Sequence, residues 1–463
     1  MRHSGHLHLP FHTHHRPARY DVDMTKGSIT KHLINFALPL MVGNLFQQLY
    51  NMVDTWVVGN YVSNEAFSAV GTVTPIINML IGFFLGLSSG AGVVISQYYG
   101  AQREEKVRQA VHTSMVLTFL MGIVFTAAGI LMTPLMLRLM KTPAEVAPEQ
   151  TTYLTIYFAG VMGLLIYNMG SGILRAVGDS RRPFYFLLVS AVLNTGLDLL
   201  FVLVFHWGIF GAAIATVSAQ LVSFLYCLVK ISKIEYVSLA KANWVPDGKM
   251  IKELLLFGLP LALQYIVIAG SGMVMQSTIN QHGSLFVAGY TASNKLYGLL
   301  ESSAISLGFA FSIFFAQNYG AGNKQRVRNG VRTGVKLSIL LALGVTVVML
   351  LIGKYLLQAF INAGEAEGPV VLEIAQHYLL VMAAFLVVCY LIHVYRNALQ
   401  AMGTSIWSMV SGFAECGVRI LMAKGVVSLL GSEVLFYIEP FAWLGALLFI
   451  MIPYYIYRKK LLA

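Results

Sequence analysis

Twelve long apolar segments dominate this sequence and restrict what it can fold into. Each has about 20 or more residues, the length at which an α-helix crosses the hydrocarbon core of a bilayer. With 57% hydrophobic and 11% charged residues, the chain also has too little polar surface to cover a soluble globule of its size. The sequence therefore predicts an all-α membrane protein with twelve transmembrane helices. The segments are residues 33–58, 67–96, 108–133, 150–174, 184–205, 209–231, 254–280, 286–316, 330–353, 372–397, 404–426 and 435–457.

Lysine and arginine residues cluster in every second connection between these segments. Because basic loops stay in the cytoplasm, this pattern places both termini there, in a multi-pass protein of the cell membrane. The net charge of +11 then reflects these loops, and we expect no nucleic-acid partner. Outside the 230–252 connection, the residues of these clusters are Arg103, Lys106, Arg108, Arg181, Arg182, Lys324, Arg326, Arg328, Arg458, Lys459 and Lys460, whereas the alternate connections hold only Arg138, Lys141, Lys354 and Lys424.

The chain is an internal duplication of two six-helix halves. FALPL at 36–40 matches FGLPL at 257–261, and QYYGAQREEKVR at 97–108 matches QNYGAGNKQRVR at 317–328, so matched positions lie 221 and 220 residues apart. Parallel repeats of this kind commonly enclose a central path for alternating access. The expected organisation is a histidine-rich cytoplasmic tail at 1–31, an amino-terminal lobe at 32–231, a cytoplasmic linker at 232–252, a carboxy-terminal lobe at 253–457 and a cytoplasmic tail at 458–463.

Histidine and cysteine residues give little sign of a metal centre. Six histidines lie in the first 20 residues, but no acidic or cysteine residues accompany them there. The three cysteines, Cys227, Cys389 and Cys416, lie far apart within apolar segments and have no metal or redox spacing. We expect a disordered tail, no cofactor, and no metal other than a coupling sodium ion.

A polar face runs along the first apolar segment. Asn44, Gln47, Asn51 and Asp54 recur at spacings of three, four and three residues, which places them on one side of a helix. A carboxylate within a membrane span is costly unless it faces protein or water, so it marks an ion or substrate pathway by default.

A second acid lies in the fifth segment. Asn194 and Asp198 are four residues apart and share a helical face. From the helical rise, Asp198, Thr216 and Asp54 each lie about 9 to 11 Å from the outer end of their segments. We therefore predict that Asp54, Asn194, Asp198 and Thr216 converge on a cation-coupling site, because hard cations and protons both bind side-chain oxygen atoms. The alternative is a structural role, with Asp198 hydrogen-bonded to its neighbours.

The second half does not repeat this constellation. Met275 stands at the position of Asp54, Glu415 at that of Asn194 and Arg419 at that of Asp198. An acid and a base four residues apart neutralise each other, which favours a structural pair over a coupling pair.

The eighth segment holds two further charges. Lys295 and Glu301 are six residues apart and lie on different helical faces. Either can face a substrate cavity, and Glu301 would attract a cationic substrate there. The alternative for Glu301 is a buried pairing with a residue of another span.

The LP openings, the two QxxGA sequences, ILRAVGDSRRP at 173–183 and LNTGLD at 193–198 together resemble the multidrug and toxic compound extrusion (MATE) transporters. The resemblance covers residues 24–457. It implies a two-lobed, V-shaped bundle that exchanges sodium ions or protons for organic, often cationic, compounds. It also implies a cation site in the amino-terminal lobe at Asp54, Asn194, Asp198 and Thr216. One branch of the family has a glutamate in span seven where this chain has Ile268, so a carboxy-terminal cation site of that type is not expected.

The predicted function is therefore antiport, by a monomer in the lipid bilayer, of organic and amphipathic small-molecule cations against protons or sodium ions. Cation entry from outside would neutralise Asp54 and Asp198 and change the packing of their helices. A flippase for a lipid-linked precursor is the alternative function. A membrane enzyme is disfavoured because clustered aspartates, HExxH, Walker-type and serine-nucleophile motifs are all missing from the sequence.

Overall fold

The computed structural model describes residues 22–61, 64–139, 147–233, 244–358, 361 and 367–461, and excludes the side chains of residues 49–76. All regular secondary structure in these ranges is helical. The first half contains α1 (Ile29–Tyr61), α2 (Asn64–Gly100), α3 (Glu104–Leu139), α4 (Ala147–Ala176), α5 (Arg181–Asp198), the π-helical η1 (Leu199–Val204) and α6 (Gly208–Ile231). The second half contains α7 (Gly248–Ile279), η3 (Asn280–His282), α8 (Ser284–Gly320), α9 (Lys324–Gln358), α10 (Gly368–Ala384), α11 (Leu386–Ala401), α12 (Ser405–Ile420), the π-helical η4 (Leu421–Val426), α13 (Val427–Leu430), η5 (Ser432–Tyr437) and α14 (Ile438–Leu461).

Each of the twelve predicted segments coincides with a helix or a run of consecutive helices. Within the described ranges, nine helices are long and apolar enough to cross a membrane, or ten when α10 and α11, which meet at a 44° bend, are taken as one span. Such helices satisfy their own backbone hydrogen bonds, as a lipid environment requires. The predicted all-α membrane fold is confirmed.

The internal repeat extends to the turns. The α2–α3 turn has Gln102 at φ 56°, and the α8–α9 turn has Gly322 at φ 73°, 220 residues later. Both turns also close with the same backbone hydrogen bond, from Arg103 N–H to the Tyr98 carbonyl oxygen and from Asn323 N–H to the Asn318 carbonyl oxygen. Similar sequences have therefore folded into the same helix–turn–helix unit twice.

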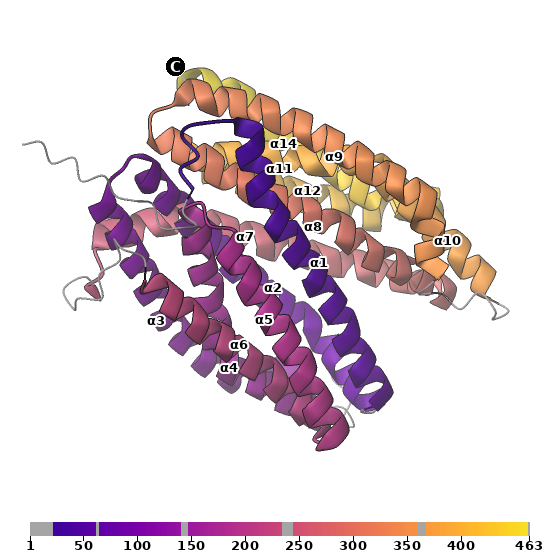
Figure 1. The fold of residues 1–463 in the computed structure, drawn as a ribbon. Helices are drawn as coiled ribbons and strands as arrows, with labels where there is room; N and C mark the ends of the chain where they lie inside the picture. The colour runs from indigo at the N-terminus through magenta and orange to yellow at the C-terminus, as the bar shows by residue number, and fades with distance from the viewer. Residues whose placement is uncertain are drawn as a thin grey trace, which may run out of the picture.

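The two halves exchange their first helices. α1 packs against α5 of its own half and α8 of the other, while α7 packs against α12 of its own half and α2 of the other. Figure 1 shows the two groups of helices diverging away from the end that carries the C-terminus, with α1 running across them. This arrangement is the V-shaped bundle of two six-helix lobes, and we call the end that carries both the start of α1 and the end of α14 the terminal side.

The segment before α1 is well packed. Residues 22–28 belong to the stretch assigned above to a cytoplasmic tail, yet Met24 is only 1% exposed and joins the core of the second half. Leu33, Phe36 and Leu40 of α1 lie in the same core. Packed residues are thus found before the predicted boundary of the first lobe, and the chain leading into α1 packs against the second lobe.

Candidate functional site

The acid predicted in the fifth span is buried beside its predicted partner. Asn194 and Asp198 are 3% and 1% exposed, and Asn194 Nδ2 donates a hydrogen bond of 3.0 Å to Asp198 Oδ2. Their spacing of four residues brings them together on one face of α5. The π-helical η1 begins at the next residue, and such turns occur frequently at functional sites. A carboxylate bound by an amide here can accept a proton or help to bind a cation.

Thr216 lies on α6, the helix that packs against α5. Its hydroxyl donates to the Ala212 carbonyl oxygen of its own helix at 3.1 Å. The hydroxyl hydrogen is therefore used within α6, and the oxygen lone pairs are what remain for a cation.

The polar face of α1 is described only in part. The side chains of Asn51 and Asp54 lie outside the described residues, so the predicted convergence of Asp54 with Asp198 stays a prediction. Asn44 Nδ2 donates to Ser306 Oγ on α8 at 2.9 Å, and Gln47 is partly buried. At Asn44, the polar face of α1 contacts the second lobe.

The second half contains a buried network of four charged groups. Glu415 accepts from Arg419 at 3.1 Å, as the i, i+4 spacing predicts, and from Arg396 on α11 at 2.8 Å. Arg419 also reaches Glu439 on α14 at 2.7 Å. Two acids and two bases thus compensate each other across three helices.

Arg419 also fills the space around Ile268, the position at which one family branch carries a glutamate. Its Nη1 donates to the Ile268 carbonyl oxygen at 3.3 Å and to the Ser271 hydroxyl. A fixed guanidinium group at this place repels a cation. The geometry therefore disfavours a cation site of that branch's type.

A cavity of about 150 Å³ opens beside this network. Glu301 lines it together with His393, Arg396 and Glu415, and Glu301 accepts a hydrogen bond from Tyr297. Lys295, six residues earlier on α8, is exposed and does not line the cavity. Of the two charges predicted in span eight, Glu301 is the one placed to meet a ligand.

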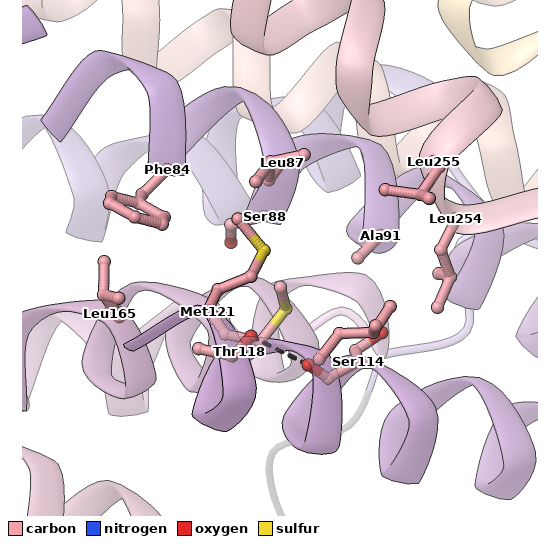
Figure 2. A pocket seen from close by; sticks show the side chains of 12 residues that line it. Phe84, Leu87, Ser88, Ala91, Ser114, Thr118, Met121, Leu165, Leu254 and Leu255 are labelled. Atoms are coloured by element: carbon pink, nitrogen blue, oxygen red, sulfur yellow. Dashed lines mark hydrogen bonds between the residues drawn. The ribbon is translucent and has the colours of Figure 1, made fainter. Parts of the chain in front are cut away.

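A second pocket, of about 40 Å³, lies between α2, α3, α4 and α7. Figure 2 shows it lined largely by apolar side chains such as Phe84, Met121 and Leu165. Two of its hydroxyl groups donate to the backbone, Ser88 to the Asn168 carbonyl and Thr118 to the Ser114 carbonyl, while the buried Ser114 hydroxyl has no hydrogen-bond partner among the described residues. This pocket is too small and too apolar to be a binding site for a charged drug.

Sequence reasoning missed three groups at the second-half site, Arg396, Glu439 and His393. Arg396 and Glu439 lie inside predicted apolar segments, where any ionisable residue is a candidate. That signal was present in the sequence, but helical spacing alone offers no partner on another helix. In the described residues, no group of three or more histidine, cysteine or acidic side chains is placed to hold a metal ion.

Comparisons with known proteins agree on one family. The MatE family profile matches residues 39–200 and 260–423. The chain is 33% identical over 344 residues to the probable multidrug resistance protein YpnP of Bacillus subtilis, covering 74% of this chain and 77% of that protein. It is 30% identical over 409 residues to the probable multidrug resistance protein YoeA of the same organism, covering 86% and 87%.

The fold leads to the same family. A solved structure described as the outward-facing conformation of a multidrug resistance MATE family transporter superposes with a TM-score of 0.88 at 21% identity, covering 96% of this chain and 99% of that one. At this identity the likeness concerns the fold alone, whereas the profile match covers most of both halves. The chain therefore belongs to the MatE family of multidrug and toxic compound extrusion transporters.

Proposed function

We propose that this transporter exports organic, amphipathic cations across the cytoplasmic membrane in exchange for protons or sodium ions. The observation that carries the proposal is the buried Asn194–Asp198 pair within a membrane-spanning helix. A carboxylate is costly at this depth, so binding of a proton or sodium ion is favourable and changes the local packing. The names of the relatives, multidrug resistance proteins, support drug-like substrates and give no support to the flippase alternative.

In the proposed cycle, a cation enters from outside and neutralises Asp198, with Asp54 as the predicted second acid. The helices α1, α5 and α6 then repack and the exported compound leaves outward. Moving one elementary charge through 100 mV supplies about 2.3 kcal/mol, enough to bias two conformations by more than tenfold. The protein works as a monomer with both termini in the cytoplasm, and it needs no cofactor.

Glu301 has a separate role in this proposal. The cavity that it lines is smaller than the about 300 to 1,000 Å³ of drug-sized pockets, so it holds only the positively charged group of a substrate. Because Arg396 and Arg419 are already engaged with Glu415 and Glu439, Glu301 supplies the negative charge that attracts this group.

The test is export of ethidium from proteoliposomes with a proton or a sodium gradient imposed in turn. We expect one gradient to drive export in the native protein, and Asp198→Asn to reduce gradient-driven export at least about tenfold by removing the ionisable group. Glu373→Gln, which changes an exposed acid on α10, is the matched control and is expected to export normally. Full coupling in Asp198→Asn, or no export by folded native protein under either gradient, would overturn the proposal.

A further inference from the structure

At the terminal side, the glutamine of each QxxGA sequence forms a hydrogen bond to the other half. Gln97, near the end of α2, donates from Nε2 to the Ala401 carbonyl oxygen at the end of α11, at 2.7 Å. Gln317, near the end of α8, donates from Nε2 to the Ala176 carbonyl oxygen at the end of α4, at 3.1 Å. Each half thus contributes one amide and receives one, so the two bonds are reciprocal.

The glycines of the same sequences bring the two helix ends into backbone contact. A Cβ at Gly100 would overlap the Gln317 carbonyl oxygen, and a Cβ at Gly320 would overlap the Gln97 carbonyl oxygen. Only glycine allows this approach at either position. The ends of α2 and α8 therefore abut directly, and the reciprocal amides lie beside that contact.

The segment 22–27 lies across both halves at the same end. Val22 N–H donates to the Val177 carbonyl oxygen of the first half at 3.3 Å. Met24 N–H donates to Gln317 Oε1 of the second half at 3.0 Å, so this glutamine is bonded through both ends of its amide.

Arg326 on α9 fixes this segment in place. Its guanidinium group donates to three carbonyl oxygens of this segment. Two bonds, of 3.0 and 3.2 Å, reach the Met24 carbonyl, and single bonds reach those of Lys26 at 3.0 Å and Gly27 at 2.9 Å. A guanidinium group presents several donors in a rigid fork, and lysine cannot reproduce that pattern. The segment is therefore bound to the second lobe as well as to the first.

We propose that these groups form a latch that holds the terminal side shut, and that its release is the step that opens the transporter to that side. The latch consists of Gln97, Gly100, Gln317, Gly320, Arg326 and residues 22–27. Separating the lobes here must part the ends of α2 and α8, and this breaks both glutamine bonds together. It also lifts the 22–27 segment from one lobe. Because these contacts break together, we expect the terminal side to have two arrangements, closed and open, without stable intermediate positions.

The latch goes beyond the proposed function, because it holds whichever compound is carried and whichever ion is exchanged. Its test therefore reads the distance between the lobes and needs neither substrate nor gradient. Spin labels are placed at Glu105→Cys and Lys324→Cys, two exposed positions in the first and second halves, with Cys227, Cys389 and Cys416 changed to alanine. Distances are measured by pulsed EPR in nanodiscs.

We expect one main short distance in this labelled protein. Gln317→Met keeps the side-chain volume but removes both amide bonds, and of these the bond to the Ala176 carbonyl joins the two halves. The long-distance population should therefore rise about threefold, the effect of losing one average membrane-protein hydrogen bond. Gln97→Met combined with Gln317→Met should raise it further. The matched control is Gln325→Ala, whose amide bonds to Asn329 of its own helix, and it should leave the distribution unchanged.

Arg326→Lys provides a second variant at a partly exposed position, and it should also raise the long-distance population. If either glutamine variant fails to fold, as judged by size-exclusion chromatography, Arg326→Lys alone tests the latch. An unchanged distribution in the folded glutamine variants or in Arg326→Lys overturns the latch and leaves the proposed antiport standing.

Discussion

The two halves carry different chemistry at the same buried position. In the first half, Asp198 is bound by an amide, Asn194. In the second half, the matching residues Glu415 and Arg419 belong to a network in which two acids meet two guanidinium groups. A network that is already neutral is costly to break, whereas a carboxylate bound by an amide can be neutralised by an arriving cation. One fold therefore holds a proposed structural site and a proposed exchange site at symmetric places.

The two main contacts between the halves, which we call the α2–α7 seam and the α8–α1 seam, also differ from each other. On α2, a Cβ at Gly86 or Gly90 would overlap the backbone of α7 at Ala262 or Gly258. The matching positions on α8, 220 residues later, are Ser306 and Ala310, and there α1 is held through the Asn44–Ser306 hydrogen bond. The α2–α7 seam joins backbone to backbone, and the α8–α1 seam joins side chains. We expect the first to keep its packing during transport and the second to rearrange.

The largest expected effect is at the proposed structural site. Glu415→Leu leaves Arg396 and Arg419 buried without their shared carboxylate, which should lower the free energy of unfolding by about 3 to 5 kcal/mol. The measurement is SDS titration of the purified protein in mixed micelles. Glu433→Gln, at an exposed acid, is the control and should change stability by less than about 0.5 kcal/mol. Native-like stability in Glu415→Leu would contradict a structural role for the network.

The next effect should come from the tight seam. Gly90→Ala places a Cβ against the Gly258 backbone, and overpacking of this kind costs about 1 to 3 kcal/mol. Gly344→Ala adds the same methyl group to α9 in open space, where removing a helical glycine stabilises by up to about 1 kcal/mol. The same titration compares the two, and effects of equal sign would argue against a close α2–α7 contact.

The looser seam should be less sensitive. Removing the hydrogen bond with Asn44→Ala or Ser306→Ala should cost about 0.6 kcal/mol, the average for polar contacts between membrane helices. A double-mutant cycle isolates the pair, because both single changes remove the same bond. A coupling energy near zero would mean that Asn44 does not hold α1 against α8.

The smallest change in stability is expected at the proposed exchange site. Asp198→Asn keeps an oxygen that accepts from Asn194 Nδ2 and removes a buried charge, so the free energy of unfolding should stay within about 0.5 kcal/mol of native or rise. Transport, measured as described above, should nevertheless lose its coupling. A loss of stability as large as that of Glu415→Leu would make Asp198 a structural residue.

The sequence was sufficient to predict the helices and their duplication, because apolar length and repeated motifs are local properties of the chain. It was also sufficient to bring Asn194 to Asp198 and Glu415 to Arg419, since helical spacing alone places each pair together. It could not supply the bonds from Glu415 to Arg396 or from Arg419 to Glu439, because those depend on how separate helices pack.

The sequence also could not predict how each helix is rotated about its axis or how individual residues pack. Helical rise gives the depth of Thr216 in the membrane but not the direction of its hydroxyl, which bonds to its own helix. Residues 22–28 are largely polar, so their sequence does not predict that Met24 is buried and bonded to side chains of α8 and α9. The π-helical η1 and η4 left no recognisable pattern in an otherwise apolar run.

Those two π-helical stretches affect how the chain tolerates changes in length. η1 begins directly after Asp198 and η4 begins two residues after Arg419, each closed by a bond from one residue to the fifth before it, Phe205 to Leu200 and Val427 to Met422. Such a stretch is an α-helix that has absorbed an extra residue. Deleting one residue there would restore a regular α-helix and leave the residues beyond it on the same faces, whereas a deletion from a plain α-helix turns everything beyond it by about 100°. At these two places, we therefore expect a single-residue deletion to shorten the helix without rotating its far end.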